Sequence, residues 1–224
     1  MIPAPPVVAV AHVPFYSQFV DVESAQWKKN ACGVVSVAMV VDYYSDKPIS
    51  VNTMLNQAIA SGAYIPSAGW THQGLISLSK KYGMTGKAYD LSSSSGKAAF
   101  ATFTTLLKDG PIIASVHYKF EPTNPIPHLV VIDGIDKDFV YYNDPASTAG
   151  GKKISVDTFR KAWKQKFIVI RPVKTEVAVV PAAPTAALTL REYGFEELPA
   201  SNTSFFTSMF AFISSAWSVD KNVG

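Results

Sequence analysis

The pattern of this chain changes at Gly110-Pro111, and that change constrains the fold more than any other feature. Before it, capping residues precede segments of helical pattern, which end near a glycine or proline. After it, short segments rich in Val, Ile and aromatic residues alternate with turn residues, which predicts strands. Helices followed by strands predict an α+β architecture rather than a parallel βαβ sheet.

These signals also set the expected elements. Helices are expected over residues 31–44, 51–61, 72–83 and 95–109. The expected N-terminal caps of the first three are Asn30, Ser50 and Thr71. Strands are expected over 112–118, 129–133, 139–143, 152–155 and 167–171, with a short helix over 156–164. The expected turns include Asp133-Gly134 and Asn143-Asp144-Pro145. The first helix is apolar on nearly every face, so we expect it to be buried.

Composition divides the chain into four parts. Residues 1–12 carry three prolines and predict an extended lead-in, and residues 13–173 predict one compact domain. Residues 174–200 are rich in Pro and Ala, which is typical of a linker. Residues 201–224 space their apolar side chains as an amphipathic helix does, so this segment could dock on its own domain, on a partner or on a membrane surface. Pro199 and many Ser and Thr residues argue against a membrane span there.

Charge and cysteine content exclude several classes of function. The chain has 20 basic and 17 acidic residues, which gives no strong basic field for nucleic acid. A single cysteine excludes an internal disulfide and a cysteine-based zinc site. The carboxylates at 133–138 lack the spacing of an EF-hand loop, so no metal or cofactor is predicted. No signal peptide is visible, but only 17% of residues are charged, and this favours a secreted or cell-surface location over the cytoplasm.

Cys32 is the candidate nucleophile. It lies in the first turn of the expected buried helix, where unpaired backbone N–H groups and the helix dipole stabilise a thiolate. The alternative is a buried cysteine that acts as a small apolar residue, which is commoner among proteins in general. Its position, and the Gly33 that follows it, favour the nucleophile.

A thiol nucleophile needs a base and a group that orients the base. His128 opens an expected strand and leads the four histidines, and His117 ranks second. His72 lies at the start of a helix, where the dipole favours its neutral form, and His12 lies in the lead-in. Asp144 follows the next strand after His128, so a hairpin would return it to the histidine, although an aspartate before proline also simply starts turns.

Acyl transfer also needs donors for the developing oxyanion. The backbone N–H of Cys32 is one candidate, and the side-chain amide of Gln18 is the other. The residues around Gln18, taken alone, favour a polar surface residue in a strand-like segment. Residues 48–79 contain no Asp, Glu, Lys or Arg, so they could line a cleft for small or apolar side chains or could simply be packed.

Four motifs, in this order, resemble the C39-like cysteine peptidases, a branch of the papain-like fold. They are VPFYSQF, NACGVVSVAMVVDYY, PHLVVIDGI and VYYNDP, and the resemblance covers residues 13–173. It implies a helical lobe whose cysteine helix packs on an antiparallel sheet that carries a histidine and an aspartate. It further implies that Cys32 is the nucleophile, His128 the general base and acid, Asp144 the orienting residue and Gln18 the oxyanion donor.

The sequence departs from the family pattern at two positions. Val34 stands where the family commonly has proline, and Pro127 stands where it commonly has glycine, which could narrow the cleft beside His128. The expected function is hydrolysis of a peptide or protein substrate through a thioester acyl-enzyme. Two alternatives stay open: a transglutaminase-like acyltransferase, and a non-catalytic module that binds peptides or cell-wall material.

Overall fold

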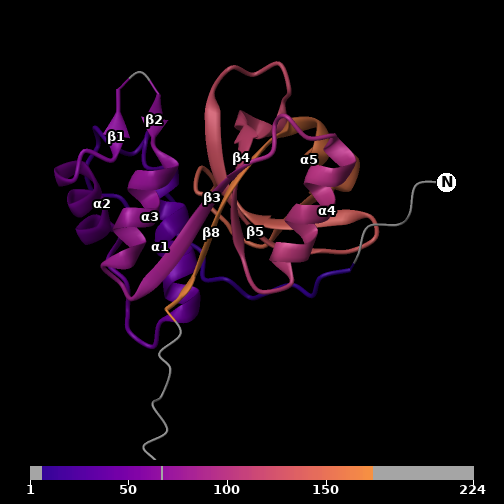
Figure 1. Ribbon diagram of the computed structural model, residues 1–224. Helices are drawn as coiled ribbons and strands as arrows, with labels where there is room; N and C mark the ends of the chain where they lie inside the picture. Colours follow the sequence, from indigo (N-terminus) through magenta and orange to yellow (C-terminus); the bar gives the residue numbers. More distant parts are fainter. Residues whose placement is uncertain (1–6, 67, 174–224) are drawn as a thin grey trace, which may run out of the picture. The chain divides into compact units, whose positions relative to one another are not determined.

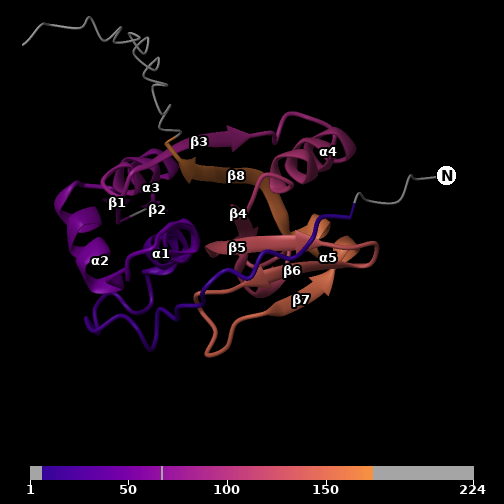
Figure 2. The ribbon, with the colours of Figure 1, turned by 90° about the horizontal axis from the view of Figure 1, so that it is seen from below.

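The computed structural model describes residues 7–66 and 68–173 (Figure 1). Within them, helices α1 (Cys32–Tyr44), α2 (Val51–Ala60) and α3 (His72–Lys80) cover one face of a six-stranded antiparallel sheet. Helices α4 (Gly96–Leu107) and α5 (Val156–Ala162) lie on the other face, and both views agree on this arrangement (Figures 1 and 2). The expected α+β architecture, with the cysteine helix packed on the sheet, is therefore confirmed.

The sheet has the strand order β3-β8-β4-β5-β6-β7. Its strands are β3 (Met84–Asp90), β4 (Ile112–His117), β5 (Pro127–Ile135), β6 (Phe139–Asn143), β7 (Lys152–Ser155) and β8 (Trp163–Pro172). A separate hairpin joins β1 (Tyr64–Ile65) to β2 (Gly69–Trp70), and a 3-10 turn, η1 (Tyr118–Phe120), follows β4. The expected linker and C-terminal segment, 174–200 and 201–224, lie outside the described residues. In the described part of the chain, no helix has the length and apolar character needed to cross a membrane.

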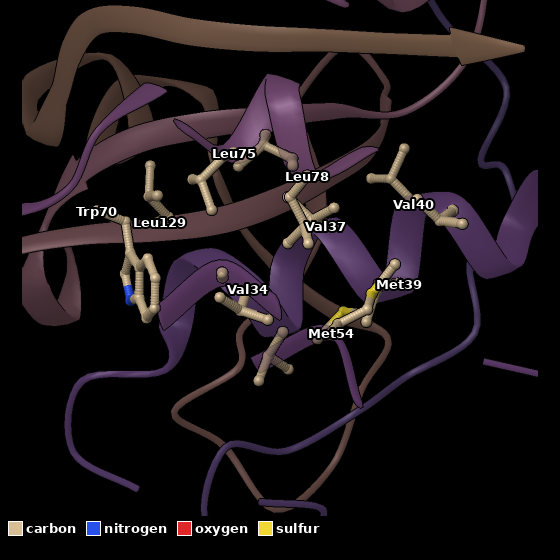
Figure 3. Close-up of a cluster of buried hydrophobic side chains, with 14 of the residues drawn as sticks. Val34, Val37, Met39, Val40, Met54, Trp70, Leu75, Leu78 and Leu129 are labelled. Atoms are coloured by element: carbon tan, nitrogen blue, oxygen red, sulfur yellow. The ribbon is translucent and has the colours of Figure 1, made fainter. Parts of the chain in front are cut away.

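Helix α1 is the centre of the core on its side of the sheet. Every residue from Gly33 to Val41 is buried, as the apolar pattern predicts. Figure 3 shows Val34, Val37 and Val40 of this helix among Leu75 of α3 and Leu129 of β5. Alternate residues of the same strands face a second core beneath α4 and α5, so the sheet holds its position from both faces.

The helix begins differently from the expectation. Asn30 does not cap it: the N-cap is Ala31, with no side-chain cap, and the first helical residue is Cys32. Residues 24–30 form turns of their own, in which the Asn30 N–H donates to the Trp27 carbonyl, so Asn30 lies one residue too early. The Asn30 carbonyl instead accepts the indole N–H of Trp70. The expected caps Ser50 and Thr71 are confirmed, because each hydroxyl accepts a backbone N–H in the first turn of its helix.

Two strand predictions were wrong. Strand β3 was missed, because it is a largely exposed edge strand that pairs only with β8 and has no apolar alternation. The expected turn at Asp133-Gly134 lies instead inside β5, at an irregularity in the pairing with β6. Residues 7–12 run beside β5 (Figure 2). The Ala11 N–H donates to the Asp133 carbonyl, and a side chain at Gly134 would meet Val10. The real turn is at 136–138.

Candidate active site

Three elements bring the candidate residues together. Cys32 is the first residue of α1, His128 is the second residue of β5, and Asp144 directly follows β6. Strands β5 and β6 are antiparallel neighbours with Val131 opposite Asn143, so the end of β6 returns to the start of β5. Helix α1 packs on β5, and the Ser36 hydroxyl donates to the Leu129 carbonyl across 3.4 Å. The beginning of the helix therefore lies beside the histidine.

His128 and Asp144 form a buried hydrogen-bonded pair. The distance from His128 Nε2 to Asp144 Oδ1 is 2.6 Å, and the side chains are 5% and 14% exposed. The same carboxylate oxygen accepts the backbone N–H of Ala146 at 2.8 Å. Burial would raise the pKa of Asp144, but the hydrogen bond and charge of His128 hold it below its usual value. This pair fixes the plane of the imidazole ring and leaves its Nδ1 atom for another partner.

Cys32 lies next to the same ring. It is half-buried, and its sulfur is close enough to influence the titration of the imidazole. Burial alone would lower the pKa of His128, but its hydrogen bonds with Asp144 and Cys32, together with the charges of both, raise that pKa to about 9. The Tyr118 ring packs edge-on against His128 at 5.2 Å between centroids. The imidazolium is therefore the favoured form of His128 at neutral pH.

Gln18 is anchored to the loop that carries Asp144. Its backbone N–H donates to the Pro145 carbonyl at 2.8 Å, and the residue is 3% exposed. Its Oε1 atom is buried and has no hydrogen-bond partner among the described residues. The backbone N–H of Cys32 is in the first helical turn, where an N–H has no intrahelical acceptor. Both N–H sources border the same cavity as the thiol.

A cavity of about 830 Å³ connects these groups. Cys32, His128 and Gln18 line it, together with residues from β2, α3, β4, β5 and β8. Part of its wall comes from the uncharged stretch 48–79, through Tyr64, Pro66, Ala68, Gly69, Trp70 and His72. Pro127, one of the two departures from the family that the sequence resembles, also borders the cavity, whereas Val34, the other, is fully buried in the core.

The other histidines lie in different settings. His117 is not among the cavity-lining residues, and its Nδ1 atom hydrogen-bonds the Asn124 carbonyl at 2.7 Å. His12 is exposed. His72 lines the cavity, and its Nε2 atom lies 3.0 Å from the Ser115 hydroxyl oxygen. Burial and the charge of Lys166 lower the pKa of His72, which keeps it neutral as the helix position predicts.

Sequence reasoning missed much of the cavity wall. Tyr118, Ser115, Lys164 and Lys166 all line the cavity, but the first two belong to the consecutive elements β4 and η1, whereas the two lysines come much later in the chain, in β8. No motif joins them. The available signal was the expected pairing of neighbouring strands, which places residues near the start of one strand beside the end of the next.

Comparisons with known proteins identify the family and the fold of this chain. The family model described as "Peptidase_C39 like family" matches residues 10–167. The pediocin PA-1 transport/processing ATP-binding protein PedD of Pediococcus acidilactici is 27% identical over 150 residues, which is 66% of this chain and 18% of PedD. This chain therefore spans less than a fifth of the length of that relative.

Solved structures share the fold. A putative C39-like peptidase from Bacillus anthracis is 21% identical, with a TM-score of 0.54 and coverage of 76% of this chain and 100% of that one. A double glycine motif protease from an AMS/PCAT transporter, solved with its leader peptide, is 23% identical, with a TM-score of 0.50 and coverage of 75% and 98%. The family match spans most of the described residues and includes Cys32, His128 and Asp144. This chain belongs to the peptidase C39-like family of cysteine peptidases.

Proposed function

We propose that this chain hydrolyses peptide bonds with Cys32 as nucleophile, His128 as general base and acid, Asp144 as the orienting carboxylate and Gln18 as an oxyanion donor. The observation that carries the proposal is the buried His128 ring, which hydrogen-bonds Asp144 Oδ1 at 2.6 Å and borders the same cavity as Cys32. An imidazole held by a carboxylate beside a thiol is the arrangement that activates a thiol nucleophile.

The first half of the reaction forms an acyl-enzyme. The Cys32 thiolate, paired with the His128 imidazolium, attacks the carbonyl carbon of the scissile bond. Negative charge moves to the carbonyl oxygen, where the Cys32 N–H and the Gln18 side-chain amide donate hydrogen bonds. His128 then gives its proton to the leaving nitrogen, the C–N bond breaks, and a thioester to Cys32 is left.

The second half releases the acid product. His128, now neutral, takes a proton from a water molecule while the water oxygen attacks the thioester carbonyl. The C–S bond breaks and the thiolate–imidazolium pair is restored. Asp144 holds the ring orientation through both halves, because its carboxylate accepts the Nε2–H and stabilises the imidazolium.

The relatives suggest the first substrate to test. One structural neighbour is a double glycine motif protease solved with a leader peptide, so a peptide that contains a central Gly–Gly is the first choice. We expect the full chain to cleave it and iodoacetamide treatment to block cleavage in step with alkylation of Cys32. Mass spectrometry of the products identifies the cleaved bond and the labelled residue.

The same assay separates the two alternatives. With an added small amine, a hydrolase yields only the free acid, whereas an acyltransferase yields an amide whose mass includes the amine. A binding module would retain the peptide without any product. Peptides without Gly–Gly serve as the comparison set. If the full chain cleaves no peptide of either set, the proposed function is contradicted.

The ionisation of His128 predicts an alkaline limit to activity. Because its pKa is raised to about 9, the imidazolium is present below that pH and is lost above it. We therefore expect kcat/KM to fall as pH rises through about 9. Asp144→Asn removes the negative charge that raises the pKa of His128. The fall in kcat/KM at high pH, which is the alkaline limb of the pH profile, should therefore move to lower pH by about one unit or more. The measurement is kcat/KM against pH for both proteins, and an unmoved limb would contradict the role of Asp144.

A further inference from the structure

We infer that the cavity holds a subsite for a carboxylate of the bound peptide, built from Lys164, Lys166, Ser115 and His72. The inference deepens the proposed function, because it assigns a substrate class to the same cavity. The peptide would carry Asp or Glu near the scissile bond, or would end there in a free carboxylate. Both sources present the same anion, and the experiment below separates them.

Apart from the proposed Cys32 and His128 pair, the charged side chains that line the cavity are all basic. Lys29, Lys164 and Lys166 line it, and no Asp or Glu of the described residues does. Among those residues, no carboxylate forms a salt bridge with Lys29 or Lys164. The Asp144 charge next to the cavity is already matched by the imidazolium of His128. A peptide carboxylate would therefore enter a positive potential, and a peptide lysine or arginine would be disfavoured.

Lys166 lies directly across from Ser115 in the sheet. The register pairs Ser115 of β4 with Lys166 of β8 on one side and with Leu129 of β5 on the other. Opposite residues of antiparallel strands carry their side chains on the same face, so these three share the face toward α1 and α3. Leu129 immediately follows His128 in β5, and both residues line the cavity, so the subsite and the proposed base border the same space.

The backbone of β8 departs from a regular strand at this point. The pairing with β4 shifts so that Val116 faces Trp163 while Ser115 faces Lys166, which leaves Lys164 and Gln165 as extra residues. Gln165 has φ of 57°, a conformation that costs energy for any residue other than glycine. Bulges of this kind redirect side chains beside active sites. Here the irregular residues carry one lysine and precede the other, and both lysines line the cavity.

His72 and Ser115 complete the subsite with neutral donors. The imidazole lies 3.0 Å from the Ser115 hydroxyl, and Ser115 is 8% exposed. When neutral His72 donates its Nε2–H to the Ser115 oxygen, the hydroxyl hydrogen is free to donate to a ligand. A carboxylate would then accept from Ser115 and from the lysine ammonium groups. Asp90 accepts from Lys166 at 2.9 Å and so weakens that lysine's field in the unliganded protein.

The direct test is binding, which does not require turnover. The probes are short acetylated and amidated peptides with a central Gly–Gly, in which Glu or Gln is placed at each position in turn. A second series replaces the amide by a free C-terminal carboxylate at increasing distance from Gly–Gly. Dissociation constants are measured with the full-length Cys32→Ala protein. At one or two neighbouring positions we expect Glu to bind about tenfold more tightly than Gln, with the ratio falling as salt rises.

Variants change this ratio in opposite directions. Lys164→Gln with Lys166→Gln should bring the Glu/Gln ratio near one, and Asp90→Asn should increase it because Lys166 loses its partner. Lys108→Gln is the matched control, since this lysine is exposed at the C-terminal cap of α4 and does not line the cavity, and it should leave the ratio unchanged. Preference confined to the free C-terminal series would assign the subsite to a chain terminus.

The outcomes distinguish this inference from the proposed function. Equal binding and equal kcat/KM for Glu and Gln peptides at every position, with no preference for a free terminus, would overturn the subsite and leave the peptidase intact. Glu-selective binding without cleavage of any peptide by the unmodified chain would support the subsite and overturn the peptidase. Circular dichroism on the lysine variants shows whether a lost preference reflects a lost fold. Asp90→Asn changes the electrostatic potential at Lys166 without removing a lysine, so it tests the subsite independently.

Discussion

Cys32→Ala is expected to lower kcat/KM for peptide hydrolysis by a factor on the order of 10⁴ or more, because no other thiol exists in the chain to form the thioester. His128→Ala should cause a loss of similar size. Without the imidazole, no group activates the Cys32 thiol and no group protonates the leaving nitrogen. The double variant should be little worse than either single variant, because groups that act as one unit are not additive. Steady-state kinetics on the Gly–Gly peptide measure all three proteins.

His117→Ala is the matched control for the histidine variant. Its ring hydrogen-bonds the Asn124 carbonyl away from the cavity, so its removal should leave kcat/KM within about twofold of the parent value. A multiplicative loss in the Cys32 and His128 double variant would contradict a shared step. Equal losses for His117→Ala and His128→Ala would point to a general effect of histidine removal on the fold.

The elements with strong local signals were predictable from sequence. The buried character of α1 follows from apolar residues on every face, and Ser50 and Thr71 cap their helices as their positions predict. The positions of Cys32, His128 and Asp144 were predictable for a related reason. Each stands at the end of an element, and a hairpin or a helix packed on a strand brings such ends together.

The features that sequence reasoning missed depend on tertiary pairing. Strand β3 has too few apolar residues to be recognised, and only its pairing with β8 makes it a strand. The lysines of β8 look like ordinary solvated charges until the register places Lys166 across from Ser115. Asp133 was expected in a turn because Asp-Gly is a turn signal, but the segment 8–11 covers it and extends β5 past it.

Asp133 has a second consequence, for stability. The residue is 5% exposed, its Oδ2 atom accepts from Asn143 Nδ2 at 3.2 Å, and its Oδ1 atom has no partner among the described residues. Burial raises the pKa of Asp133 to about 7 in the folded protein, against 3.8 for the free group. The folded state therefore holds a proton that the unfolded chain releases between about pH 4 and pH 7.

The sign of the effect follows from this proton. As pH rises through that interval, the unfolded state ionises first, so Asp133 lowers the free energy of unfolding by up to about 4 kcal/mol, and no further loss occurs above pH 7. Asp133→Asn cannot ionise and keeps an acceptor for Asn143. The free energy of unfolding of the variant should therefore match that of the parent near pH 4 and increasingly exceed it as pH rises to 7. Urea unfolding at several pH values measures the difference.

Asp138→Asn is the control for that experiment, because Asp138 is exposed in the adjacent turn and makes no side-chain hydrogen bond within the described residues. Its stability should follow the parent at every pH. Parallel curves for Asp133→Asn and the parent would show that the carboxyl is already ionised at low pH, which a partner or water inside the fold would have to explain. A diverging curve would show instead that this chain keeps a neutral acid five residues from its histidine, next to the asparagine that precedes Asp144, and that the destabilisation from this acid is smallest near pH 4 and grows up to pH 7.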